Sequence, residues 1–334
     1  MGTELTIQSR DTQYIARVSV GGKDSTKMLE VIVSRGLPLD RITSTTVWAT
    51  DTIRGEHPKM VEFEPRFDEF VWRKYRIEVE HLCAMRDGKK VTYEQMFYRV
   101  PERRAEKCGG VLQTAGNDPR LPDLVGALVP EITQSTKGFR RGFLCKEGLG
   151  AKSSSIYGFP VSINRRGQWC QKLKTEFLEG PTPRGGTNIV EYLGIAADEP
   201  KRFGQLSDRK RAPLVEFGIE EGLCGLYCQY EGILAPVYET GCRDGCWFCH
   251  NQGVNQLRLL RKEYPELWAL LLKWDTDSPV YFKPGKPDKS GKPTSRTVHD
   301  YDRRFQMEDE GLLIPGDRRF RWEMLDGEFQ IRMF

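Results

Sequence analysis

Residues 18–26, Val-Ser-Val-Gly-Gly-Lys-Asp-Ser-Thr, combine the residue types of a phosphate-binding turn. They follow a strand-like apolar run at 14–20 and precede a helical pattern of apolar residues that starts at Met28. Two adjacent glycines allow a tight turn in which several backbone N–H groups point into one hollow, and the helix start adds the positive end of its dipole. An ordinary surface turn is the alternative. We predict that phosphate oxygens are bound by Gly21, Gly22, Lys23, Ser25 and Thr26.

A second polar loop is predicted to lie beside the first. The strand-like run 44–49 ends shortly before Asp51, and ligands of open parallel sheets bind beyond the carboxyl ends of the strands. The loops after 14–20 and after 44–49 should therefore line one crevice. This arrangement places Trp48 and Asp51 near a nucleotide held by Lys23, and Asp51 would hold magnesium or the ribose. Asp24 is expected to orient the glycine turn or to cap the following helix.

The cysteines of segment 242–249, Cys-Arg-Asp-Gly-Cys-Trp-Phe-Cys, have the spacing of a metal site. A CxxC turn brings two sulfur atoms to one metal, and soft thiolates select zinc or an iron–sulfur cluster. We predict Cys246 and Cys249 as ligands, with Cys170 and Cys242 completing the set. Cys228 is an alternative to Cys242, although its place on a predicted helix also suits core packing. Four thiolates suit Zn²⁺ and a 4Fe-4S cluster equally well.

The glycine turn does not have the GxxxxGK(S/T) spacing of ordinary P-loop NTPases. Its segment 20–25, Val-Gly-Gly-Lys-Asp-Ser, resembles the SGGKDS loop of the PP-loop ATP pyrophosphatases and of the phosphoadenosine phosphosulfate (PAPS) reductase family. Val20 stands where that family has its first serine, so one hydroxyl contact to phosphate is lost. Segment 51–58, Asp-Thr-Ile-Arg-Gly-Glu-His-Pro, resembles the DTGxExP segment of the same family, with Ile53 in place of glycine.

Later segments extend the resemblance. Residues 165–174, Arg-Arg-Gly-Gln-Trp-Cys-Gln-Lys-Leu-Lys, look like the RWCxxxLK motif of the family. Residues 194–202 are similar to GIRxDESxxR and keep Asp198, Glu199 and Arg202. The Trp-Cys pair followed by GCWxC resembles the metal-bearing branch, which includes iron–sulfur adenylylsulfate reductases and the sulfur-transfer proteins of DNA phosphorothioation. The resemblance covers most of residues 15–260, apart from an insertion at about 101–150.

The resemblance implies an α/β fold. A parallel-sheet PP-loop domain, of the adenine nucleotide alpha-hydrolase-like type, would occupy residues 1–275 and contain the cysteine site at 170–250. Residues 276–334 would form a basic linker and a C-terminal extension. The implied enzyme binds ATP with Mg²⁺, cleaves it between the α and β phosphates and adenylates an acceptor, for sulfur transfer to a nucleic acid. Catalytic roles are implied for Lys23, Asp24, Ser25 and Asp51.

Two other functions remain open. A sulfonucleotide reductase, acting on PAPS or adenylylsulfate, would attack the sulfate sulfur with a cysteine on a C-terminal tail. The last cysteine of this chain is Cys249, which weighs against reduction. A non-catalytic nucleotide-binding subunit with a structural metal site is the second alternative, and Val20 favours it. Besides the nucleotide, a nucleic acid or a sulfur-donor protein is the expected partner.

The elements around these loops alternate between strands and helices, as a parallel α/β sheet requires. After the second loop, 58–75 has a helical pattern and 77–79 is strand-like. Further along the chain, 189–194 is strand-like and 220–230 is an amphipathic helix.

The composition describes a soluble globular protein, with 334 residues of which 38% are hydrophobic and 29% charged. Nine cysteines, without a signal peptide or a membrane-spanning run, indicate a reducing cytoplasm. The net charge of +4 permits a polyanionic partner. The basic stretch 283–296 is either a solvated linker or a nucleic-acid contact.

Overall fold

The chain divides into two compact units in the computed structural model. Unit 1 joins Met1–Thr92 to Lys172–Trp247, and unit 2 joins Tyr93–Gln171 to Phe248–Phe334. The predicted insertion at 101–150 lies outside the described residues, except for the strands β6 (Phe143–Leu144) and β7 (Gly150–Ala151). The structure describes residues 12–86, 88–98, 143–144, 150–151, 158–160, 170, 173, 188–204, 206, 208–239, 245–278, 280–283, 285, 294–316, 320 and 322.

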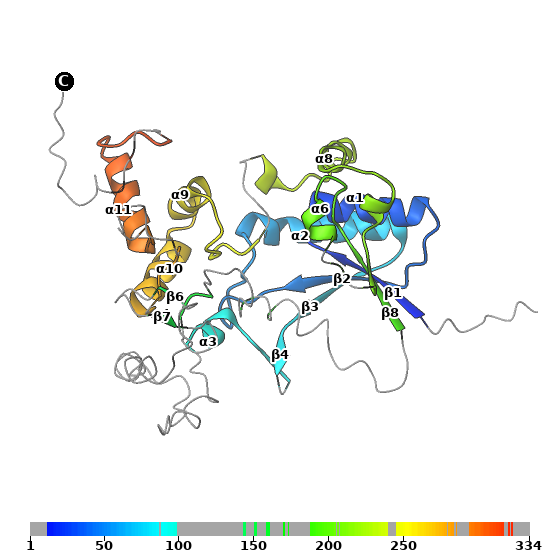
Figure 1. Cartoon of the computed structure of the whole chain (residues 1–334), viewed down its shortest axis with the longest axis horizontal. Coiled ribbons are helices and arrows are strands. Elements are labelled where there is room, and N and C mark those ends of the chain that lie inside the picture. The colour runs from blue at the N-terminus through cyan, green and yellow to red at the C-terminus, as the bar shows by residue number, and fades with distance from the viewer. Residues whose placement is uncertain are drawn as a thin grey trace, which may run out of the picture. The chain divides into compact units, whose positions relative to one another are not determined.

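Unit 1 is built on a five-stranded sheet in which all strand pairs are parallel. The strand order is β3-β2-β1-β8-β9, with β1 at the centre. Figure 1 labels the first four of these strands. The α/β class and the parallel sheet that the sequence predicts are therefore confirmed. The strands are β1 (Thr12–Val18), β2 (Arg41–Thr46), β3 (Val79–Cys83), β8 (Asn188–Leu193) and β9 (Lys210–Arg211).

The first two strands end earlier than the apolar pattern predicts. β1 ends at Val18 rather than at residue 20, and β2 ends at Thr46 rather than at residue 49. The reason at β2 is that the following residues bond within their own loop, where the Gly55 N–H donates to Val47 O at 2.6 Å. Val47 and Ala49 are buried, but they are buried in a loop and do not extend the strand ladder.

Helix α1 (Lys23–Ser34) follows β1 and packs an apolar stripe toward the sheet. Met28, Leu29 and Ile32 of this stripe are fully buried. Burial of such a side chain contributes about 1.5–3 kcal/mol relative to its exposed state. The stripe thus fixes α1, so that the first turn of the helix stays at the carboxyl end of β1.

Helix α2 (Pro58–Tyr75) has the bounds that the sequence predicts. It starts with Pro58. Proline has no backbone N–H, but an N–H at the first helical position would have no acceptor within the helix, so no hydrogen bond is lost. The His57 ring caps the helix, because its Nδ1 accepts the Lys59 N–H at 3.3 Å. The helix ends at Tyr75 and is capped by Arg76, whose φ of 59° is left-handed.

Helix α8 (Glu221–Tyr230) corresponds to the predicted helix 220–230 and packs on α1. Figure 1 shows α1, α2 and α8 on the same side of the sheet. The Tyr227 ring joins them, because Lys27 Nζ of α1 lies 4.5 Å and Lys74 Nζ of α2 lies 5.1 Å from the ring centroid. Cys224 and Cys228 are fully buried on the inner side of α8, which is the core packing considered for them from the sequence.

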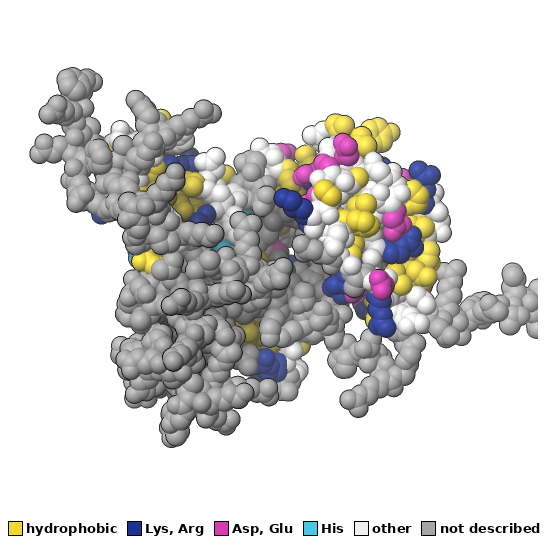
Figure 2. Space-filling view, viewed as in Figure 1, with side chains coloured by type: hydrophobic (Ala, Val, Ile, Leu, Met, Phe, Trp, Pro, Cys, Tyr) yellow, Lys and Arg dark blue, Asp and Glu magenta, His cyan; other side chains and the backbone are white. Residues whose placement is uncertain are grey.

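The outer face of α8 is apolar. Leu223, Leu226 and Tyr230 follow each other at helical spacing and are 53%, 62% and 87% exposed. Figure 2 shows these apolar side chains gathered over α8. The stripe faces away from α1, so it plays no part in positioning the first turn of that helix.

Unit 2 is held together by helices α9 (Val254–Glu263), α10 (Pro265–Asp277) and α11 (Val298–Asp309). Arg258 donates to Glu308 at 2.6 Å, which ties α9 to α11. On α10, the Trp268 ring lies 5.9 Å from the Phe305 ring of α11. The sequence places residues 254–275 with the nucleotide-binding domain, whereas these contacts group them with the C-terminal helix.

An aromatic cluster fills the rest of unit 2. The Tyr93 ring centroid lies 4.0 Å from that of Phe248 and 5.1 Å from that of Trp274. The basic stretch 283–296 is described mainly at its ends, where Lys283 and Arg296 exchange backbone hydrogen bonds of 2.9 and 2.8 Å. In the described part of the chain, no helix has the length and apolar character needed to cross a membrane. The remaining elements are β4 (Met85–Arg86), β5 (Lys89–Lys90), α3 (Tyr93–Phe97), α6 (Pro200–Phe203), α7 (Pro213–Glu216) and the 3₁₀ helix η4 (Pro236–Tyr238).

Candidate functional site

The turn between β1 and α1 has the tight geometry that its glycines allow. Gly21 has a φ of +64°, and a Cβ atom there would lie 2.8 Å from the Cβ of Ala235 and 2.9 Å from the Phe63 ring. Only glycine meets both conditions without displacing its neighbours. The Gly22 N–H donates to Ser19 O at 2.9 Å and closes the turn. The glycine turn is therefore packed firmly against α2 and the segment before η4.

The first turn of α1 has the donors and the sign of charge that an anion needs. Gly22 is the N-cap and offers no side chain to the first N–H groups of the helix. These N–H groups, which belong to Lys23, Asp24 and Ser25, have no acceptor within an α-helix, and the helix dipole makes this end positive. Helix starts of this kind bind phosphate and carboxylate groups.

This turn lies where the strand order reverses. The chain runs outward from β1 through β2 to β3, and β8 pairs with β1 on the opposite side. Ligands of open α/β sheets bind beyond the carboxyl ends of the strands at such a reversal. The end of β8 approaches α1 closely, because a Cβ atom at Gly194 would lie 2.8 Å from Ser25 N and 3.0 Å from the Asp24 carbonyl carbon. The loops after β1 and β8 therefore meet at one edge of the sheet.

The Lys23 ammonium group is held by two carboxylates. It donates to Glu221 Oε1 at 2.6 Å and to Asp24 Oδ1 at 3.0 Å, and its side chain is 17% exposed. Burial disfavours the charged form, but the hydrogen bonds to Glu221 and Asp24 outweigh it, so the pKa of Lys23 lies above its usual value. Lys23 is therefore charged at neutral pH and carries anionic partners from α1 and α8.

The surroundings of Lys23 are acidic. Burial raises the pKa of the Asp24 carboxyl, although the hydrogen bond from Lys23 lowers it in part. Asp198, in the loop after β8, accepts the Glu221 N–H at 3.1 Å through its Oδ1. Asp198 of segment 198–202 thus lies at the start of α8.

The hydroxyl groups of Ser25 and Thr26 stabilise the glycine turn. Ser25 Oγ accepts the Ser19 N–H at 3.2 Å, and Thr26 Oγ1 donates to Gly22 O at 2.9 Å. Thr26 is fully buried, so its hydroxyl faces the turn and not the solvent. The predicted phosphate contacts of this segment therefore depend on backbone N–H groups, Lys23 and Ser25.

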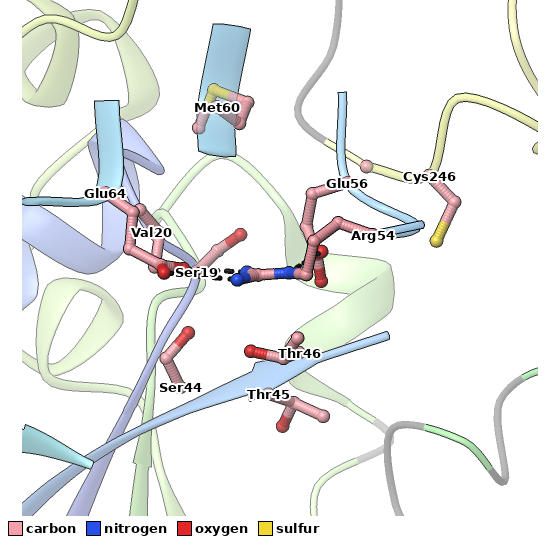
Figure 3. A pocket seen from close by; sticks show the side chains of 11 residues that line it. Ser19, Val20, Ser44, Thr45, Thr46, Arg54, Glu56, Met60, Glu64 and Cys246 are labelled. Atoms are coloured by element: carbon pink, nitrogen blue, oxygen red, sulfur yellow. Dashed lines mark hydrogen bonds and ion pairs between the residues drawn. The ribbon is translucent and has the colours of Figure 1, made fainter. Parts of the chain in front are cut away.

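A small pocket opens at the carboxyl ends of β1 and β2, next to the glycine turn (Figure 3). Its volume is about 50 Å³, which is room for a few water molecules and far less than a whole nucleotide occupies. Both loops that the sequence places at one crevice contribute to its wall, together with the start of α2 and one cysteine. The wall residues are Ser19, Val20, Ser44, Thr45, Thr46, Arg54, Glu56, Met60, Glu64, Gly245 and Cys246.

Arg54 crosses this pocket between two carboxylates, as Figure 3 shows. Its Nε donates to Glu56 at 2.9 Å, and its terminal nitrogens donate to the two Glu64 oxygens at 3.2 and 2.8 Å. Burial disfavours the guanidinium charge, but the carboxylates of Glu64 and Glu56 outweigh it and raise the pKa of Arg54. Two carboxylates around one guanidinium leave the pocket with a negative charge.

Polar groups of β2 and one thiol complete the wall. Ser44 and Thr46 are 4% and 6% exposed, and Figure 3 shows their side chains on the floor of the pocket. Cys246 reaches the pocket because segment 245–247 pairs with the loop after β2. In that pairing the Trp247 N–H donates to Gly55 O at 2.9 Å, and the Trp247 indole N–H donates to the carbonyl of residue 54 at 2.9 Å.

Trp48 and Asp51 lie in the same loop but outside the wall of this pocket. Lys90, from the hairpin of β4 and β5, covers the Trp48 ring with its Nζ 3.5 Å from the centroid. The same ammonium group donates to Asp51 O at 3.0 Å, and Asp51 itself is exposed. The expected contacts of Trp48 and Asp51 with a nucleotide stay predictions.

No family model matches the chain, and no curated protein or solved structure matches it.

The predicted metal site is described only in part. Cys242 lies outside the described residues, whereas Cys170, Cys246 and Cys249 are described and partly exposed. Within the described ranges, no three Cys, His, Asp or Glu side chains come close enough to hold a metal ion. The thiolate site for Zn²⁺ or an iron–sulfur cluster therefore stays a prediction from the sequence, and it carries no step of the chemistry proposed below.

Two charged residues of this region, Glu64 and Glu221, were not predicted from the sequence. Glu64 offered a signal, because a carboxylate next to Phe63 on an apolar helix face needs a buried partner, which Arg54 supplies. Glu221 offered none. Its contact with Lys23 joins residues that are 198 positions apart, and it exists only because α8 packs on α1.

Proposed function

We propose that this chain is an adenine-nucleotide-binding enzyme of the PP-loop type, which cleaves ATP between its α and β phosphates. An acceptor oxygen would attack the α phosphorus, the bond from that phosphorus to the bridging oxygen would break, and pyrophosphate would leave. Sulfur would then displace AMP from the acceptor, which we propose is a nucleic acid. The observation that carries the proposal is the position of the glycine turn, at the carboxyl end of β1 where the strand order reverses.

The hydrogen-bond donors of the region assign the two parts of the nucleotide to different places. The first turn of α1 offers backbone N–H donors and the Lys23 ammonium group, which suit phosphates. In the neighbouring pocket the Arg54 guanidinium donates to Glu56 and Glu64, so its charge is already used by these two carboxylates. The hydroxyl groups and the small volume of this pocket suit an uncharged polar edge of the nucleoside. The phosphates are therefore assigned to α1 and the nucleoside to the side of the pocket.

The chemistry that this proposal asks of the protein is electrostatic. Lys23 and the first N–H groups of α1 would stabilise the charge that develops on the leaving pyrophosphate. Asp24 holds the Lys23 ammonium group at 3.0 Å and so orients it. Mg²⁺ bound with ATP would neutralise phosphate charge, and the carboxylates of Asp24 and Asp198 are the oxygen ligands that this ion prefers.

The test is Lys23→Ala, measured by pyrophosphate release from ATP in the presence of DNA and RNA acceptors. The loss of one preorganised donor to a developing anion is expected to slow release by about 10²-fold or more. The fold should persist, because α1 is held by its buried apolar stripe of Met28, Leu29 and Ile32. Lys27→Ala is the control, since Lys27 lies one turn further along α1 and pairs with Glu30 at 2.6 Å. An unchanged ATP affinity in Lys23→Ala would defeat the assignment.

The two alternative functions predict different results. ATP binding without pyrophosphate release, with every acceptor tried, would favour the non-catalytic nucleotide-binding subunit, for which the missing hydroxyl at Val20 argues. Formation of an S-sulfo cysteine from adenylylsulfate would favour the reductase.

A further inference from the structure

The two carboxylates on Lys23 differ in how easily they can leave. Asp24 belongs to the same helical turn and its side chain is 23% exposed, whereas Glu221 comes from α8 and its side chain is 54% exposed. The contact to Glu221 is nevertheless the shorter one, at 2.6 Å against 3.0 Å. Glu221 is thus a carboxylate that is placed on the ammonium group while more than half of its side chain is exposed to solvent.

The backbone that presents Glu221 is held independently of its side chain. Its N–H donates to Asp198 at 3.1 Å, and the fully buried Cys224 and Cys228 anchor the following turns of α8. The Cys228 thiol also donates to the Lys23 carbonyl oxygen at 3.7 Å, which connects α8 to the first turn of α1. A change confined to the Glu221 carboxylate should therefore leave the position of α8 unchanged.

We propose that the Glu221 carboxylate occupies the place of a ligand phosphate on Lys23, so that a nucleotide must displace it in order to bind. This inference rests on the proposed function, because it takes Lys23 as the phosphate-binding residue. A single phosphate exchanges one anionic partner of the ammonium group for another and gains little. A polyphosphate also reaches the N–H groups of the first turn of α1, and this gain offsets the displacement. Glu221 thereby weakens the binding of every phosphate ligand, and a polyphosphate makes the further contacts that compensate for this loss.

The sign of the expected effect distinguishes this role from a structural one. Removal of a carboxylate that only supported the site would weaken ligand binding, whereas removal of a competitor strengthens it. Because Glu221 is more than half exposed, its ion pair with Lys23 is a weak one, and Glu221→Gln is expected to lower the Kd for ATP by about two- to five-fold. The Kd for AMP should fall by about the same factor, because both ligands have to displace the same carboxylate from Lys23.

The experiment measures ATP and AMP affinities by titration calorimetry for the natural protein, for Glu221→Gln and for a matched control. Glu220→Gln is that control, because it removes the same charge from an exposed residue directly before Glu221. It should leave both affinities within about 1.5-fold of those of the natural protein, since a well-solvated charge is screened. Weaker or unchanged ATP binding in Glu221→Gln would overturn the inference.

A second measurement needs no nucleotide. Acetylation of Lys23 by acetic anhydride, followed by mass spectrometry, reports how accessible its amine is. It should proceed about two- to five-fold faster in Glu221→Gln, because the variant lacks the ion pair that holds the ammonium form. Faster acetylation in Glu221→Gln, with no ATP binding in either protein, would refute both the binding of a nucleotide and the competition between Glu221 and its phosphates. The same result would establish the contact between Glu221 and Lys23. Equal acetylation rates together with equal ATP affinities would refute only the role of Glu221.

Discussion

The close approach of β8 to α1 can be tested with Gly194→Ala. The added methyl group would lie 2.8 Å from Ser25 N, 3.0 Å from Ser25 Cα and 3.0 Å from the Asp24 carbonyl carbon. All of these are backbone atoms of the first turn of α1. No flexible side chain is available to move aside, so either the end of β8 or the glycine turn has to shift.

The size of the effect follows from two opposing contributions. Overpacking a well-packed region costs about 1–3 kcal/mol. Replacement of glycine by alanine restricts the unfolded chain and returns about 0.4–1 kcal/mol. Gly194 has no positive φ, so no backbone strain is added. We expect Gly194→Ala to lower the free energy of unfolding by about 1–2 kcal/mol, and to weaken ATP binding because the N–H donors of the first turn move.

Urea denaturation followed by circular dichroism, together with ATP titration, measures both effects. Gly222→Ala is the matched control, because a Cβ atom at Gly222 in α8 would meet nothing within 4 Å. That variant should gain about 0.5–1 kcal/mol from better helix propensity. If Gly194→Ala is as stable as Gly222→Ala and binds ATP like the natural protein, β8 does not abut the first turn of α1, and the argument for the site fails.

The remaining predictions concern one carboxyl group and the cysteines. The raised pKa of Asp24 means that the folded chain holds this proton more tightly than the unfolded chain, so ionisation of Asp24 destabilises the fold as the pH rises. Asp24→Asn should therefore be more stable than the natural protein at neutral pH in urea denaturation, and this gain should vanish as the pH falls below 3.8, the usual pKa of the group. Cys246→Ser and Cys249→Ser should each reduce the metal content of anaerobically purified protein, measured by mass spectrometry of the elements, and lower the melting temperature with it. Full metal occupancy in both variants would remove these cysteines from the ligand set.

The sequence by itself determined the local features of this protein. The bounds of α2 follow from its apolar spacing and from Pro58, and the glycine pair marks the turn before α1. Alternation of strands and helices was enough to predict the parallel sheet, because each strand and the helix after it are encoded by neighbouring residues. Strand ends were less accurate, since Val47 and Ala49 are apolar and buried although they lie in a loop.

The tertiary structure alone decided which side chains face one another. Glu221 meets Lys23 across 198 positions of the chain, and Trp247 bonds to the carbonyl of residue 54 across 193 positions. Such contacts depend on how separately formed elements pack, and no periodicity or spacing in the chain encodes them. For this reason the glycine turn and the helix after it could be predicted from their residues, whereas the Glu221 carboxylate on Lys23 and the charges of the neighbouring pocket could not.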